Sequence, residues 1–214
     1  MEGHFAHLRA HPGDDILSTL VHAHSAEGKL TQDELTATAM LLLAAGFETT
    51  VNLIGNGTAL LIAHPEQHDR LRAEPALWPN AVDEVLRFDS PVQRTGRVAQ
   101  RDTVLAGVRV PVGKPVMALL GGANRDPEVF DEPGRFDVGR PNAGEHLAFS
   151  SGIHYCLGAG LARMEGTVGL QALFGRFPDI ALAGTPHRRA TRVLRGYESV
   201  PVRLSAPARQ AKAS

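Results

Sequence analysis

The spacing of hydrophobic and polar positions predicts a chain made mostly of helices. Acidic residues precede apolar ones at helical spacing in residues 12–26, which predicts a capped amphipathic helix. Thr31-Gln32-Asp33-Glu34 forms a capping box, so a second helix is expected to begin at Leu35. No proline interrupts this helix before Pro65, and about 30 helical residues extend roughly 45 Å at 1.5 Å per residue. Such a length predicts a helix that crosses the whole molecule.

Beyond Pro65 the pattern changes several times. Residues 94–120 show a shorter period, with Gly and Pro between short runs of Val, which is typical of strands. Residues 124–147 lack periodicity, and ordered loops of that length are usually functional. The expected elements are helices at 65–72, 79–88 and 157–177, strands at 104–113 and 116–119, and a strand pair within 193–204. The sequence therefore predicts one mainly α domain with a small β part over residues 1–205, followed by a frayed tail at 206–214.

Composition and charge narrow the classes of function. The chain has 22 Lys and Arg against 23 Asp and Glu, and this balance does not favour nucleic-acid binding. Its single cysteine rules out an internal disulfide framework and is typical of a reducing compartment. The first residues lack the charged and apolar regions of a signal peptide. The longest apolar run, residues 39–47, is far shorter than the ~20 residues of a membrane span. We therefore expect a soluble, cytoplasmic protein with no membrane span.

The single cysteine, Cys156, lies where an irregular loop is expected to enter a helix. Peptide N–H groups at a helix start lack partners and the helix dipole favours negative charge, so this position favours a thiolate ligand. Gly152, Gly158 and Gly160 remove side chains on both sides, which lets a large flat group approach the backbone. His154 is placed to meet an anionic group at the edge of that ligand. The alternative is that Cys156 is a small buried hydrophobic residue and the glycines serve turns and packing.

Residues 149–158, Phe-Ser-Ser-Gly-Ile-His-Tyr-Cys-Leu-Gly, resemble the haem-ligand loop of the cytochrome P-450 superfamily, the haem-thiolate monooxygenases. That family pattern is Phe, a small residue, any, Gly, any, His or Arg, any, Cys, any, Gly. Every fixed position matches, with Ser150 where Gly is commoner. The resemblance implies haem b as cofactor, Cys156 as the axial iron ligand and His154 as a propionate contact. The cofactor-binding residues implied by this loop are Cys156, His154, Phe149, Gly152 and Gly158.

The middle of the long helix carries residues that a buried apolar helix disfavours. Gly46, Glu48 and Thr49 interrupt an otherwise apolar stretch, and local rules broken together often mark function. The alternative is a helix kink with Glu48 in a buried hydrogen bond. In the resembling family this is the acid–alcohol pair of the oxygen site. The resemblance implies that Thr49 hydrogen-bonds dioxygen while Glu48 relays protons with water.

The resemblance also implies a structural role for a group of charged residues. Glu84 and Arg87 share a helix face, although most such pairs are solvated surface bridges. Arg140 lies at the matching place in the irregular segment, and in the resembling family these three fix that segment beneath the haem. Their implied role is a buried structural network. Arg97 falls where the family places a propionate-binding arginine, and Arg94 is the nearby competitor.

The family motifs appear in order over residues 31–165 and correspond to the second half of the family fold. The resemblance implies insertion of one oxygen atom from O2 into a small apolar organic substrate. Electrons would come from a ferredoxin or flavin-type donor docking near Cys156, where Arg97, Arg101 and Arg163 supply positive potential. Because the first half of the family fold is missing, the alternative is a catalytically inactive truncated haem-binding protein, or a fragment that needs a partner half.

Two other classes of function fit the sequence less well. His64 and His68 have the i, i+4 spacing of a metal hydrolase, but no H-E-x-x-H motif is present. Gly158-Ala159-Gly160 has the start of a nucleotide-binding fingerprint, but it lacks the third glycine and a βαβ context.

Overall fold

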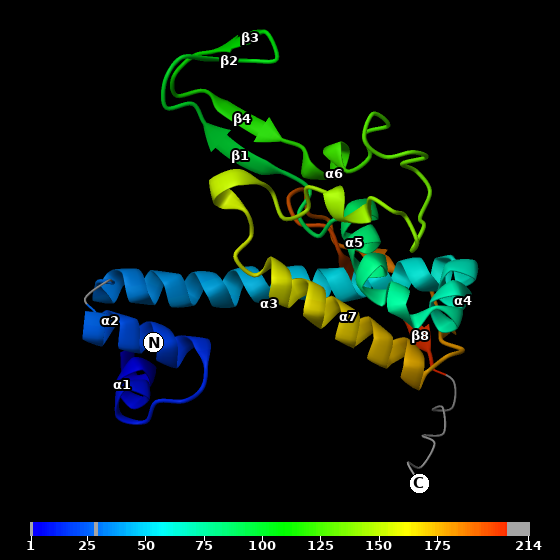
Figure 1. The fold of residues 1–214 in the computed structure, drawn as a ribbon, viewed down its shortest axis with the longest axis horizontal. Helices are drawn as coiled ribbons and strands as arrows, with labels where there is room; N and C mark the ends of the chain where they lie inside the picture. The colour runs from blue at the N-terminus through cyan, green and yellow to red at the C-terminus, as the bar shows by residue number, and fades with distance from the viewer. Residues whose placement is uncertain (1, 28–29, 205–214) are drawn as a thin grey trace. The chain divides into compact units, whose positions relative to one another are not determined.

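The structure, a computed structural model, describes residues 2–27 and 30–204 (Figure 1). It is mainly helical with a small β part, as the sequence predicts. The chain divides into two compact units, one ending at Glu48 and the other beginning at Thr49. The predicted tail at 206–214 lies outside the described residues.

The first unit contains two short helices and the beginning of a long one. These are α1 (Glu2–Ala10), α2 (Ile16–Glu27) and the first part of α3 (Gln32–Ala63). The predicted helix over 12–26 corresponds to α2, which starts later because Asp15 precedes it and accepts a hydrogen bond of 2.9 Å from the Ser18 backbone N–H. The sequence did not predict α1. The buried apolar side chains of this unit are Phe5, Leu8, Val21, Leu35 and Ala39.

Helix α3 begins at the capping box that the sequence indicates. The Thr31 N–H donates to a Glu34 carboxylate oxygen at 2.7 Å, and the Glu34 N–H donates to the Thr31 hydroxyl at 3.2 Å. The helix ends at Ala63, before Pro65, after 32 residues. By length and composition it is also able to cross a membrane, a test that the core helix of a soluble protein passes equally.

The second unit has its core where the later part of α3 packs with α5 and α7. Its helices are α4 (Pro65–Ala73), α5 (Trp78–Phe88), α6 (Leu120–Ala123) and α7 (Ala159–Arg176), with 3-10 turns η1 (Pro75–Leu77), η2 (Ala143–Glu145) and η3 (Gly152–His154). The three longer helices agree with the prediction to within two residues at either end. The core includes Leu53, Trp78, Val82, Val85, Leu86, Leu170 and Phe174.

Within residues 2–27 and 30–204, the β part consists of four antiparallel strand pairs. They are β1 (Thr95–Val98) with β4 (Pro115–Ala118), β2 (Thr103–Leu105) with β3 (Val108–Val110), β5 (Ala181–Leu182) with β8 (Val202–Arg203), and β6 (His187–Arg188) with β7 (Tyr197–Ser199). Ala106 and Gly107 both have positive φ, 46° and 81°, as a tight hairpin between β2 and β3 requires. The predicted strand pair within 193–204 is wrong, because β7 and β8 each pair with an earlier strand rather than with each other.

Candidate functional site

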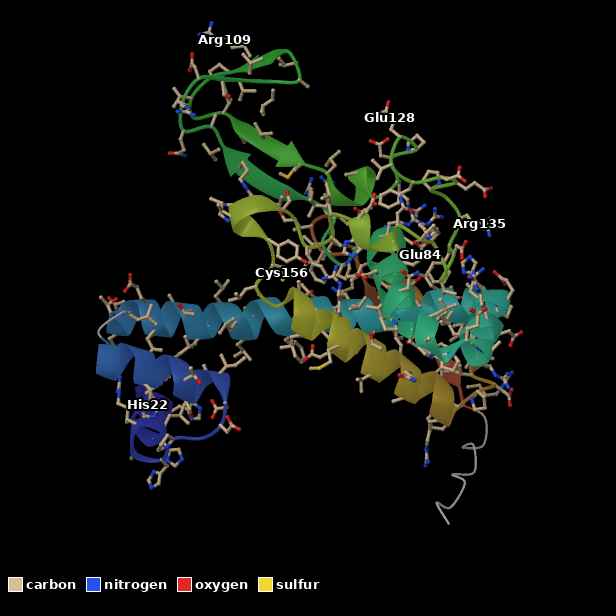
Figure 2. The ribbon with its side chains drawn as sticks, viewed as in Figure 1. His22, Glu84, Arg109, Glu128, Arg135 and Cys156 are labelled. Atoms are coloured by element: carbon tan, nitrogen blue, oxygen red, sulfur yellow. The ribbon has the colours of Figure 1, made fainter. Side chains whose placement is uncertain are left out.

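Cys156 lies in the loop between η3 and α7, and its thiol is exposed (Figure 2). The alternative of a small buried cysteine is therefore wrong. The loop backbone is held from within, because the Cys156 N–H donates to the Phe149 carbonyl at 3.0 Å. Ser150 and Gly152 adopt left-handed conformations with φ of 61° and 66°. These turns place Cys156 directly before α7.

The surface around the thiol fits a flat apolar group. Ile153 is 98% exposed and Leu157 is 90% exposed, although both are large apolar side chains. A Cβ built on Gly152 or Gly158 would meet no atom within 4 Å, so neither glycine is required by packing within the described chain. Cys156 is thus surrounded by exposed apolar side chains and by two glycines that no packing contact requires, as a site for a large flat apolar group needs.

The candidate propionate contacts lie on two segments. His154 is exposed at the end of η3. Arg97 is exposed on β1, where its guanidinium donates at 2.8 Å both to the Thr95 hydroxyl and to the Gly96 carbonyl. Arg94, the competitor, has a buried Nε without a hydrogen-bond partner among the described residues. The structure thus leaves both arginines as candidates for an anionic group.

Glu48 and Thr49 lie in the middle of α3, and both side chains are half-buried. Both make interactions within the chain. Just before them, a Cβ built on Gly46 would meet nothing within 4 Å, so this stretch of α3 is open beside the glycine. The helix assignment continues through this position from Gln32 to Ala63.

The packing of α7 on α3 relates Thr49 to the cysteine loop. Gly166 lies against Leu53, Gly169 lies against Ile54, and Leu170 lies against Gly57. Residue numbers rise together along both helices, so the two helices cross in a parallel sense. The N-terminal end of α7, which follows Cys156, therefore points toward the Thr49 end of this part of α3.

Glu84, Arg87 and Arg140 come together in the interior of the second unit, where all three are buried. Arg87 forms a bidentate pair with Glu84, with nitrogen–oxygen distances of 2.6 and 2.8 Å, and both residues are fully buried. Arg140 Nε approaches both oxygens of the same carboxylate at 3.2 and 3.3 Å. The two positive charges thus share one negative charge.

Backbone carbonyls of the irregular segment complete this network. Arg87 donates to the carbonyls of Asn124, Pro133 and Arg135 at 2.9 to 3.1 Å. All five of its N–H donors thus have partners, as a buried guanidinium requires. Arg140 donates to three carbonyls of the same segment, those of Asp131, Glu132 and Arg135. The network therefore fixes residues 124–140, which have little regular structure of their own.

A second charged cluster, which sequence analysis missed, lies close to the cysteine loop. The Asp83 carboxylate accepts hydrogen bonds from His146 at 3.1 Å and from Arg163 at 2.7 Å. Burial raises the pKa of the Asp83 carboxyl, but these hydrogen bonds outweigh it, so its pKa lies below the usual value of 3.8. Nothing local signals this role, because both partners are more than 60 positions away in the chain.

A mainly helical fold with an exposed cysteine directly before a helix agrees with the haem-thiolate class that the sequence resembles. Residues 4–185 match the family model described as Cytochrome P450, and the chain belongs to this family. The resemblance identified from the sequence is thus confirmed, as is the partial family fold. Members of the family hold haem through a cysteine thiolate, which makes haem the cofactor of this fold.

Similar proteins show how much of the family fold is present. The chain is 56% identical to the putative cytochrome P450 140 of Mycobacterium tuberculosis, over 98% of this chain and 48% of that protein. It is 47% identical to the 6-deoxyerythronolide B hydroxylase of Saccharopolyspora erythraea, over 92% of this chain and 49% of that protein. The tirandamycin C-bound P450 monooxygenase TamI superposes with a TM-score of 0.89 at 42% identity, covering 95% of this chain and 52% of TamI. The chain therefore spans about half the length of the curated relatives it matches.

Proposed function

We propose that this chain is the haem-binding part of a monooxygenase that inserts one oxygen atom from O2 into a small apolar organic substrate. The observation that carries the proposal is the exposed Cys156 thiol, held on a fixed backbone at the start of α7 and surrounded by exposed apolar side chains. When bound, haem with a thiolate ligand supplies the chemistry of O2 activation.

The loop residues hold the cofactor in this proposal. Cys156 is the axial ligand, and Gly152 and Gly158 leave room for the ring. Phe149 packs against the core of the second unit, and its carbonyl accepts a hydrogen bond from the Cys156 N–H. His154 and Arg97 hold the propionates in this proposal, with Arg94 as the competitor for Arg97. Support comes from the exposure of His154 and Arg97 and from the resemblance of their positions to the family pattern.

Glu48 and Thr49 serve the oxygen side in this proposal. The Thr49 hydroxyl donates a hydrogen bond to dioxygen, and the Glu48 carboxylate passes protons from solvent water. Support comes from their shared position on an uninterrupted α3 and from the parallel crossing of α7, which directs the cysteine end of α7 toward Thr49.

The proposed electron donor is inferred from charged residues, and the proposed class of substrate is inferred from the relatives. We propose a ferredoxin or flavin-type donor that docks near Cys156. Arg97 and Arg101, which are exposed, and Arg163, which is paired with Asp83, are the cationic residues proposed to attract it. Relatives include a hydroxylase named for 6-deoxyerythronolide B and a vitamin D(3) 25-hydroxylase, which supports an apolar organic substrate here. A cytoplasmic location without a membrane span is part of the same proposal.

The test is the absorption spectrum of the purified chain after haem addition, reduction and exposure to carbon monoxide. We expect the long-wavelength Soret band of a thiolate-ligated ferrous–CO haem. The band should disappear in Cys156→Ala and persist in Ser151→Ala, a control at an exposed position of the same loop. Absorption typical of histidine ligation in the unmodified chain would contradict the proposal.

The half-length coverage favours one second candidate, an inactive haem-binding fragment that needs a partner half. Addition of the N-terminal half of a mycobacterial relative discriminates between the two. If the CO band and substrate oxidation appear only after this addition, the chain is a dependent half and not an enzyme by itself.

A further inference from the structure

We propose that Asp83 is a positioning residue that holds both ends of the cysteine loop, through His146 before the loop and through Arg163 after it. Asp83 is on α5, directly before Glu84 of the buried network. Its Oδ1 atom accepts both hydrogen bonds, from His146 Nε2 and from Arg163 Nε. One carboxylate oxygen therefore joins two segments that flank Cys156.

His146 ties the segment before the loop. Its ring is fully buried, and Nδ1 accepts a hydrogen bond of 3.2 Å from the Ala148 backbone N–H. Because Nδ1 accepts, the ring proton lies on Nε2, where it is donated to Asp83. The His146 ring also packs on the Phe149 ring with centroids 5.6 Å apart. The bond to Asp83 thus fixes the tautomer and the orientation of a ring that supports residues 148–149.

Arg163 ties the end of the loop from α7. Its NH1 donates to the Tyr155 hydroxyl at 3.2 Å, and its guanidinium lies over the Phe149 ring at 4.8 Å from the centroid. Burial lowers the pKa of Arg163, but hydrogen bonds to Tyr155 and Asp83 outweigh it and raise the pKa, so the guanidinium stays charged. Arg163 therefore carries the constraint from Asp83 to the residue directly before Cys156.

The hydrogen bonds of Asp83 matter for the position of Cys156 because the loop around Cys156 is exposed and has few packing contacts of its own. Tyr155 is 51% exposed, and neighbouring Ile153 and Leu157 are more exposed still. The backbone bond from Cys156 to Phe149 sets the inner geometry of the loop, but it does not place the loop on the helices. Phe149 and Tyr155 both contact Arg163, and these contacts tie the loop to α7. The cluster is also more enclosed than a surface ion pair, with side-chain exposures of 0% for His146, 19% for Asp83 and 32% for Arg163.

This inference rests on the proposed function in one respect, which is that Cys156 is the haem ligand. The effect of Asp83 on the position of the loop can be measured on the haem-free chain. Asp83→Ala removes both hydrogen bonds, whereas Asp83→Asn keeps an amide oxygen that accepts both and removes only the charge. Asp102→Ala is the matched control, since Asp102 accepts from Arg109 and from the Val112 N–H at a hairpin without contact to the loop.

The first measurement is hydrogen exchange at single amides of the haem-free chain. In Asp83→Ala we expect the amides of Cys156 and Ala148 to exchange roughly tenfold faster, as loss of a charge-assisted hydrogen bond predicts. The Phe177 amide, bonded to the Leu173 carbonyl at the far end of α7, should be unchanged. Asp83→Asn should restore most of the protection, and Asp102→Ala should resemble the wild type.

A second variant keeps the test valid if Asp83→Ala does not fold. Arg163→Gln removes the tie after the loop and leaves His146 on Asp83, so exchange should rise at Cys156 and not at Ala148. Equal protection in all variants would overturn the proposal. So would a uniform increase that includes Phe177, because it would show a general loss of stability.

The haem-bound chain gives an independent readout. In Asp83→Ala we expect part of the ferrous–CO Soret intensity to move away from the thiolate position, and in Asp83→Asn we expect it to stay. If the unmodified chain shows no thiolate band, the proposed function fails while the exchange data still decide the role of Asp83. If the band is present and identical in every variant while exchange is unchanged, Asp83 does not position the loop.

Discussion

Two glutamate–arginine pairs with the same i, i+3 spacing occupy opposite environments in this chain. Glu84 and Arg87 have side-chain exposures of 0%, whereas Glu132 and Arg135 are 64% and 58% exposed at a similar distance. An exposed pair contributes little to stability because water and salt screen it. A buried pair is costly to break, because the remaining charge is left without its partner in a poorly solvated site. The burial of Glu84, and not its spacing from Arg87, therefore determines how much the pair contributes to stability.

The two pairs form a matched mutational test. We expect Glu84→Gln to lower the free energy of unfolding by about 3–5 kcal/mol, because Arg87 and Arg140 then face a neutral amide. Glu132→Gln should change it by less than about 0.5 kcal/mol. Urea unfolding followed by circular dichroism measures both. Equal effects of the two substitutions would contradict the buried network as a source of stability.

His68 predicts a pH dependence at the residue scale. It is 8% exposed on α4 and packs on Phe174, and burial together with the nearby Arg72 lowers its pKa below the usual 6.5. The unfolded chain then binds a proton at a higher pH than the folded chain. The stabilising contribution is complete above pH 6.5 and is lost as the pH falls toward the lowered pKa of the folded state.

Unfolding experiments between pH 8 and pH 5 test this contribution. The wild type should lose stability as the pH falls below 6.5, and His68→Gln should lose less over the same interval. His11→Gln, at an exposed position, should keep the wild-type slope. A slope that His68→Gln leaves unaltered would assign the pH dependence to other groups.

At the scale of elements, the sequence predicted what local chemistry determines. Thr31 and Glu34 indicate the start of α3 because both capping bonds lie within one turn of helix. The partners of β7 and β8 were not predictable in this way, since pairing depends on strands that are distant in the chain. The same difference between local and long-range contacts determines which parts of the candidate site were predictable. The pattern around Cys156 is contiguous, whereas the link from Asp83 to His146 and Arg163 exists only after folding.

Helix α7 shows how glycine positions set the distance between elements. Gly166 faces α3 and α5, where an added Cβ would lie 2.9 Å from Leu53 and 3.1 Å from Val82, both fully buried. Gly175 lies on the same helix, is exposed, and has nothing within 4 Å of an added Cβ. The first glycine therefore permits close helix packing, and the second only weakens the helix.

The same substitution at these two positions should have opposite effects. Gly166→Ala is expected to destabilise the chain by about 1–3 kcal/mol through overpacking. Gly175→Ala should stabilise it by up to about 1 kcal/mol, since alanine favours the helix. Thermal unfolding measures both shifts. Stabilisation by Gly166→Ala would mean that α7 does not pack on Leu53 as closely as the structure describes.

At the scale of the whole molecule, both units carry large apolar side chains on their surfaces. In the first unit, Leu43 and Phe47 of α3 are 71% and 73% exposed. In the second unit, Ile153 and Leu157 beside the thiol are still more exposed. The relatives are about twice as long as the region that matches, and in them further chain accompanies this region. Contiguous apolar surface of this kind mediates binding to another chain or association of like chains.

We therefore expect the isolated chain to associate with itself in a concentration-dependent manner. Leu43→Gln combined with Phe47→Gln should shift the equilibrium toward the monomer, because it removes apolar surface without disturbing a buried contact. Ala37→Gln, on an exposed position of the same helix, serves as the control and should leave association unchanged. Sedimentation velocity over a hundredfold range of concentration, on the order of 1 to 100 μM, resolves these species in the regime where exposed apolar surface drives aggregation. A wild-type chain that stays monomeric throughout this range would contradict the prediction.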